Sequence, residues 1–71
     1  MTSRELQVLK TIYQLGGQCS LQAISKNTGL GLNYSRELVK VLLKQRLLNQ
    51  PVGRLVALTA LGRSLIAARP E

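Results

Sequence analysis

The chain has 71 residues, of which 45% are hydrophobic and 18% are charged, so it is too apolar for a disordered segment and long enough for one small domain. Ten Lys or Arg residues against three Asp or Glu residues give a formal net charge of +7, which favours a polyanionic partner. With one cysteine and no histidine, the usual ligand sets for structural zinc are missing. We therefore expect a single domain over residues 1–71 that holds neither a metal nor a cofactor.

The sequence also indicates where the protein is located and whether it is an enzyme. The segment MTSRELQ lacks the apolar run of a signal peptide, and no stretch approaches the roughly 18 apolar residues of a membrane helix. We expect a soluble protein of the cytoplasm, associated with the nucleoid if the source is bacterial. The acids Glu5, Glu37 and Glu71 are scattered, so no enzyme activity is expected. Nothing beside Cys19 would lower its thiol pKa, which favours a small buried side chain over a redox switch.

The first predicted helix covers residues 3–15 and begins at a capping box. Thr2 is the N-cap, and Glu5 stands three residues further on, where its side chain can reach back to the cap. Gly16 and Gly17 end the helical pattern. Apolar residues at three- and four-residue spacing predict the buried face, which comprises Leu6, Leu9, Ile12 and Tyr13, with Val8 and Leu15 on its flanks.

A second and a third helix follow, separated by a tight turn. Residues 18–19 leave room only for a short strand or an extended link, and Ser20 is a good N-cap for a helix that ends at Thr28. Gly29 suits the left-handed position after that helix. The third helix covers about residues 32–45.

The third helix has one apolar and one polar face. Leu38, Val39 and Leu42 form the side that should contact the core. The polar side occupies about one third of the circumference and carries Asn33, Arg36, Glu37, Lys40 and Lys44. A helix-turn-helix presents its recognition helix in this way.

Residues 47–58 predict a two-stranded hairpin with its tip at residues 51–54. Pro51 and Gly53 interrupt the pattern, and the segment after them is β-compatible. Thr59 then caps a last helix. That helix ends near Pro70, and its apolar side carries Leu61, Leu65 and Ile66.

This order of helices, short strand and hairpin resembles a winged helix-turn-helix over nearly the whole chain. Residues 24–30 (ISKNTGL) are similar to the second helix and turn of bacterial regulators of the MarR, IclR and PadR kind, in which a small residue lets the two helices approach and a glycine four positions later makes the turn. Ser25 and Gly29 occupy those positions here. Residues 58–63 (LTALGR) are similar to the signature that follows the wing, in which Gly62 allows close packing. The resemblance implies a mainly α fold with a three-helix core, a wing of two to three strands and a C-terminal helix.

Two residues depart from the pattern of those regulators. Ser35 stands where an apolar β-branched residue usually faces the core, and its hydroxyl must bond back to the helix backbone if it is buried. Looser packing or a slightly rotated helix is expected there, with Tyr34 and Glu37 the first residues to change roles. Arg46 replaces a frequent glycine, so a left-handed turn is less favoured and the connection into the wing is expected to differ.

The resemblance implies a transcription regulator that binds double-stranded DNA sequence-specifically, with the helix over about 32–45 in the major groove. Arg36 can pair bidentately with guanine and Asn33 with adenine, whereas Glu37 can accept a hydrogen bond from cytosine. Lys40 is placed with these base-reading residues, although its position farther along the helix also suits a phosphate.

Other candidate contacts lie around this helix. Helix N-termini and small polar groups commonly anchor to phosphate, and the candidates are Ser20, Lys26, Tyr34 and Lys44. Tyr34 could instead cover the rim of the core. Arg54 lies at the tip of the wing, which covers about residues 48–58, and could reach the minor groove or a flanking phosphate, or could simply keep a turn soluble.

Two alternative functions and one quaternary expectation complete the sequence-based prediction. A winged helix can also serve as a protein–protein interaction module. RNA or non-specific nucleic-acid binding is the other alternative, although two Tyr and no Phe or Trp argue against base stacking of single strands. Because bacterial relatives usually bind palindromic sites as dimers, the resemblance implies a homodimer through the first or the last helix.

Overall fold

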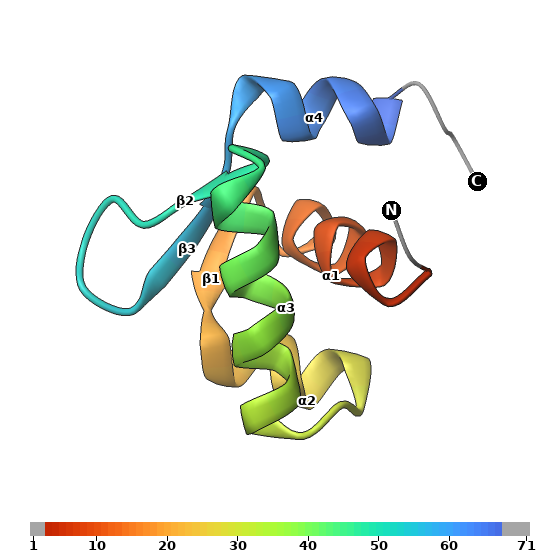
Figure 1. Cartoon of the computed structure of the whole chain (residues 1–71), viewed down its shortest axis with the longest axis vertical. Helices are drawn as coiled ribbons and strands as arrows, with labels where there is room; N and C mark the ends of the chain where they lie inside the picture. Colours follow the sequence, from red (N-terminus) through yellow and green to blue (C-terminus); the bar gives the residue numbers. More distant parts are fainter. Residues whose placement is uncertain (1–2, 68–71) are drawn as a thin grey trace.

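The computed structural model describes residues 3–67, which form four helices around a three-stranded antiparallel sheet (Figure 1). The helices are α1 (Ser3–Gln14), α2 (Leu21–Thr28), α3 (Leu32–Lys44) and α4 (Ala60–Ala67). The strands are β1 (Gln18–Ser20), β2 (Leu48–Asn49) and β3 (Leu55–Leu58). The fold is therefore the mainly helical winged helix-turn-helix that the sequence predicted.

The sheet has β3 at its centre, with β1 and β2 paired antiparallel on either side. Cys19 of β1 lies opposite Val56, and Leu48 of β2 lies opposite Leu58. All four side chains are buried, so one face of this short sheet belongs to the core. The predicted hairpin thus gains a third strand, and residues 18–20 are a paired strand rather than an extended link.

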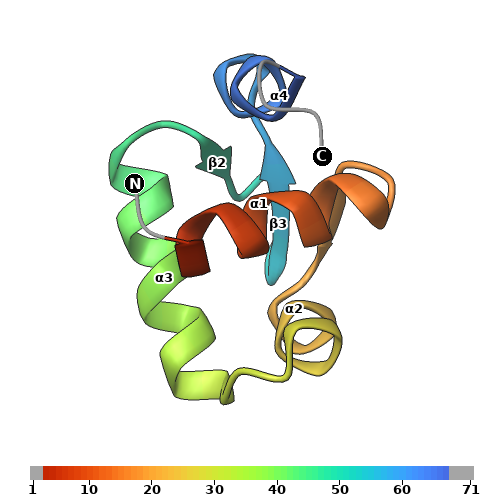
Figure 2. The same ribbon diagram turned by 90° about the vertical axis from the view of Figure 1, so that its right-hand side faces the viewer.

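The core lies where α1, α2 and α3 meet the sheet. Figure 2 shows α1 running across the sheet, with α3 on one side and α2 on the other. The helices contribute fully buried apolar side chains from all three directions, namely Val8, Leu9, Ile12, Ile24 and Leu42. Burial of such side chains is the main stabilising contribution in a domain of this size.

The buried face of α1 differs from the predicted one. Tyr13 is 53% exposed and Leu15 is 40% exposed, whereas Val8 is fully buried. The buried stripe is centred on Val8, Leu9 and Ile12, and it also takes in Glu5, so Tyr13 falls beyond its edge at 100° per residue. Expecting Tyr13 on the buried face was wrong, and Val8, expected on its flank, lies at its centre. The predicted Thr2 cap lies outside the described residues.

The turn between α2 and α3 is fixed by side-chain hydrogen bonds as well as by a glycine. Ser20 caps α2, because its Oγ accepts from the Ala23 N–H at 3.1 Å. Gly29 adopts the left-handed conformation with φ of 77° and donates to the Ser25 carbonyl. Ser25 Oγ in turn donates to the Leu30 carbonyl oxygen at 2.7 Å. The predicted cap and turn glycine are confirmed.

The last helix is attached through Thr59, as the sequence predicted. Thr59 Oγ1 accepts from the Gly62 N–H at 3.1 Å, and a Cβ at Gly62 would collide with the Leu47 carbonyl oxygen. Ile66 is buried, but Leu61 is 56% exposed. The core therefore covers only part of the predicted apolar side of α4 and leaves Leu61 in solvent. Pro70 lies outside the described residues.

The two departures from the family pattern have different outcomes. Ser35 is fully buried, and its hydroxyl finds no hydrogen-bond partner within residues 3–67, so the expected bond back to the helix backbone is absent. The helix is not rotated, because Leu38 stays buried while Tyr34 stays exposed. Arg46 adopts a left-handed conformation with φ of 62°, so the turn is kept despite the missing glycine.

Ser35→Ala should raise the free energy of unfolding by about 1 kcal/mol, because a buried hydroxyl without a partner costs free energy that alanine does not incur. Urea denaturation followed by circular dichroism measures this change. Ser25→Ala is the matched control and should be destabilising by a similar amount, because its hydroxyl is bonded. Equal losses in both variants would show that the Ser35 hydroxyl is satisfied in solution.

Arg46→Gly should also be stabilising, by about 0.5–1 kcal/mol. Relief of the left-handed strain, about 1–2 kcal/mol, outweighs the extra entropy that glycine adds to the unfolded chain. Arg46→Ala keeps a Cβ and should give no gain. Thermal melts of the three proteins make the comparison, and a glycine variant no more stable than the alanine variant would contradict this account of the turn.

Candidate nucleic-acid interface

The polar face of α3 is directed toward solvent. Its N-cap residue, Gly31, has an extended backbone, and Gly31, Leu32 and Asn33 are exposed at the helix N-terminus. The five predicted polar residues are all exposed, namely Asn33, Arg36, Glu37, Lys40 and Lys44. The opposite side, formed by Ser35, Leu38, Val39 and Leu42, holds the helix on the core.

Two of these exposed residues form an ion pair with each other. Lys40 Nζ lies 3.6 Å from Glu37 Oε2, one turn apart on α3. Both side chains are more than half exposed, so the pair contributes little to stability. Lys40 can therefore exchange this carboxylate for another anion at low cost.

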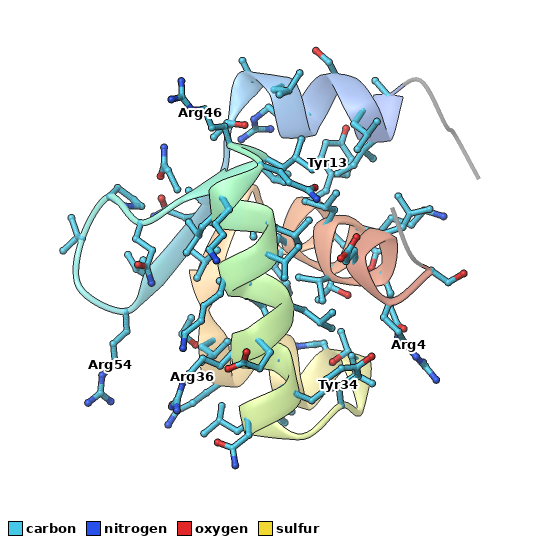
Figure 3. All side chains as sticks on the ribbon, in the orientation of Figure 1. Arg4, Tyr13, Tyr34, Arg36, Arg46 and Arg54 are labelled. Carbon is cyan, nitrogen blue, oxygen red and sulfur yellow. The ribbon has the colours of Figure 1, made fainter. Side chains whose placement is uncertain are left out.

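A groove separates α3 from the wing, the loop and strands over residues 48–58. It has a volume of about 440 Å³. Arg36 and Lys40 line it from α3, and Arg54 lines it from the wing. Ser20 and Gln22 close it at the N-terminus of α2. In Figure 3 the side chains of Arg36 and Arg54 extend on the same side of the molecule. Four predicted contacts from three elements thus share one surface.

The charged side chains that line this groove are all positive. Its lining contains two arginines and one lysine but no Asp or Glu. Ser20 Oγ already accepts a hydrogen bond from the Ala23 N–H, yet a hydroxyl keeps its own proton available for donation. Together with the N-terminus of α2, where Ser20 and Leu21 are half-buried and Gln22 is exposed, these groups make an environment suited to anions.

The other predicted contacts lie outside the groove. Asn33, Glu37 and Lys44 stay on the exposed face of α3. Tyr34 is exposed as well and lies on the other flank of α3 from Arg36 (Figure 3). Lys26 belongs to the last turn of α2, away from the end of that helix that meets the groove.

Gln50 is a groove residue that the sequence analysis missed. It directly follows β2, whose Asn49 pairs with Ala57, and its amide can donate to a phosphate or to a base edge. In the sequence, only the register of the strand before it could have indicated which way Gln50 faces. Since β2 has two residues, alternation along the sequence could not have assigned Gln50 to the side that faces α3.

Two further findings concern other kinds of chemistry. Cys19 is buried, and burial raises the pKa of its thiol, which keeps it protonated and poorly nucleophilic near neutral pH. None of the helices within residues 3–67 has the length and apolar character needed to cross a membrane.

Comparison with known proteins finds structural neighbours only. No family model matches the chain, and neither does any curated protein. BpsR of Bordetella bronchiseptica, whose DNA binding is regulated by 6-hydroxynicotinic acid, is similar with a TM-score of 0.87 and 30% sequence identity over 96% of this chain and 52% of that one. RV1404 of Mycobacterium tuberculosis is similar in fold, with a TM-score of 0.81 and 23% identity over 94% and 49%. The chain spans about half the length of either neighbour.

Proposed function

We propose that residues 1–71 are a single DNA-binding domain of a transcription regulator of the MarR, IclR or PadR kind. The observation that carries this proposal is the acid-free groove, where cations of α3 and the wing share one surface. The similarity to BpsR, a protein whose DNA binding is regulated, supports it. The domain would act by binding in the cytoplasm rather than by catalysis, with no metal or cofactor.

In the proposed complex, α3 enters the major groove of double-stranded DNA through its exposed face. Base edges would be read by Asn33, Arg36, Glu37 and Lys40. Phosphates would be bound by Ser20, Lys26, Tyr34 and Lys44. Arg54, at the tip of the wing, would contact the flanking DNA backbone or the minor groove. Glu37 has a second role in this arrangement, because a cytosine that bonds its carboxylate would release Lys40 to a neighbouring phosphate.

Arg36→Ala should lower affinity for a duplex selected from a random library by roughly 1–3 kcal/mol and relax the preference at one base pair, whereas Lys44→Ala should weaken all duplexes alike and reduce the salt slope by about one. The difference arises because bases carry sequence information and phosphates do not. Fluorescence anisotropy at several salt concentrations measures both effects.

Arg4→Ala is the control with a matched charge change, since Arg4 is exposed on α1 and its guanidinium bonds only weakly, at 3.4 Å, to Gln7. It should bind like the parent protein. Absence of duplex binding at low salt would refute the proposed function. Equal losses in all three variants, without any sequence preference, would favour non-specific nucleic-acid binding instead.

We also propose that the domain forms a homodimer through α1 and α4. These helices contact each other, and they carry Tyr13 and Leu61, both more than half exposed. Figure 3 shows Tyr13 on the side of α1 that faces α4. Two-fold pairing of such apolar side chains would bury surface that a monomer leaves in water.

Leu61→Lys should convert the dimer to a monomer, because pairing across a two-fold axis would place two added charges in one apolar interface. Sedimentation equilibrium measures the mass. Val52→Lys adds the same charge at the wing, where Val52 is 68% exposed, and should leave the mass unchanged. A parent protein that is monomeric at every concentration would rule the dimer out.

A further inference from the structure

The tip of the wing is unusually apolar for a turn. Pro51, Val52, Gly53 and Arg54 are all exposed, and Val52 keeps 68% of its surface in solvent. No other large apolar side chain within residues 3–67 is as exposed. Gly, Asn, Asp and Ser are usual in turns, whereas Val is favoured in strands. The wing therefore ends in two adjacent apolar residues, Pro51 and Val52, that the domain itself leaves in solvent.

A hydrogen bond closes this tip. The Leu55 N–H donates to the Val52 carbonyl oxygen at 2.9 Å, which joins the first and the last residue of a four-residue turn. Gly53 follows Val52 with a left-handed φ of 49°, a conformation that glycine adopts without strain. Pro51 restricts the backbone before the turn through its fixed φ. The closed turn thus carries an apolar side chain and a cation, Arg54, on one loop, which extends away from the helices (Figure 1).

The cation at the tip indicates what the apolar residues contact. Arg54 lines the acid-free groove together with Arg36, and both side chains extend on the same side of the molecule (Figure 3). The wing tip is thus continuous with the surface that binds DNA in the proposed function. A tip that met only phosphates would gain little from Pro51 and Val52, because the phosphate backbone is charged and hydrated. Proteins of the minor groove combine both kinds of residue, cations that read the groove and apolar side chains that insert between base steps.

We propose that Pro51 and Val52 form an apolar wedge that enters the minor groove beside Arg54 and partly unstacks one base step. This inference rests on the proposed function and adds a conformational requirement to it, since the bound duplex is kinked at that step. Pyrimidine–purine steps, namely TA and CA, are the most easily kinked and unstacked. The domain therefore selects such a step where the wing contacts DNA, and this selection needs no hydrogen bond to a base edge.

The balance of two free energies explains why the step matters. Insertion removes the apolar surface of Val52 from water at the cost of base stacking. The stacking cost is smaller at a flexible step than in a stiff A-tract, whereas the gain from burying the valine is the same in both. The difference in affinity between two such duplexes therefore reports the deformation of the DNA.

The direct test uses duplexes selected from a random library by the full chain, with 2-aminopurine placed in turn at each flanking step. This base fluoresces more strongly when it is unstacked. Binding should raise its fluorescence at one flanking step, and energy transfer between dyes at the duplex ends should report a bend of about 20–90°. Tight binding with neither change would overturn the wedge, because the wing would then lie on an undistorted backbone.

Val52→Ser removes the apolar side chain without changing the charge, and Val41→Ser makes the same change on α3, at an exposed residue outside the groove. Val52→Ser should abolish the fluorescence rise and weaken binding about three- to tenfold. Its salt slope should be unchanged, because no phosphate contact is lost. Val41→Ser should behave like the parent protein. Equal fluorescence changes in the parent protein and Val52→Ser would overturn the assignment to Val52.

Exchange of the flexible step completes the test. Replacing it by an A-tract step should weaken binding of the parent protein about fivefold and of Val52→Ser less than about twofold, because only the wedge meets the stacking cost. Equal losses would overturn the selection of a flexible step. A mass that falls to that of a monomer for Val52→Ser in sedimentation equilibrium would assign the tip to a second copy of the chain and overturn its role on DNA. Absence of any duplex binding would refute the proposed function together with the wedge, whereas binding without unstacking would refute the wedge alone.

Discussion

The position of the wing relative to α3 depends on one hydrogen-bonded joint at Thr59. Its Oγ1 donates to the Arg46 carbonyl oxygen at 2.7 Å, and its N–H donates to the Leu47 carbonyl oxygen at 3.1 Å. The same Oγ1 accepts from the Gly62 N–H. The end of α3, the start of β2 and the first turn of α4 therefore meet at one threonine. Since β3 ends at Leu58, the residue before it, this joint also holds the strand that carries the wing, and with it the width of the groove.

Part of the positive charge of the chain gathers at one place in the fold. Three of the ten Lys and Arg residues, namely Arg36, Lys40 and Arg54, line one groove whose lining contains no acid. The nearby acid, Glu37, pairs with Lys40 at the surface.

Helical periodicity predicted the amphipathic character of α3 correctly, because its apolar and polar residues separate cleanly around the helix. It was less successful for α1, where it placed the exposed Tyr13 on the buried face. A periodic pattern shows which apolar residues share a stripe, but it does not show how much of that stripe the rest of the domain covers. Tyr13 and Leu61 belong to such stripes and remain exposed. Gln50 was missed for a different reason, since it follows a strand too short to show alternation, and its position depends on pairing with β3.

Ser35 and Arg46 show why local rules did not determine the backbone here. Both residues are unfavourable by local criteria, and yet α3 keeps its orientation and the turn after it stays left-handed. At the turn, the geometric requirement comes from residues that are close in space. Leu47 N–H must donate to the Leu42 carbonyl oxygen, while the Leu47 carbonyl oxygen must accept from Thr59. A left-handed residue at position 46 lets the chain reverse sharply enough for both bonds. The path is thus set by the joint at Thr59, and arginine adopts a conformation that glycine would adopt with less strain.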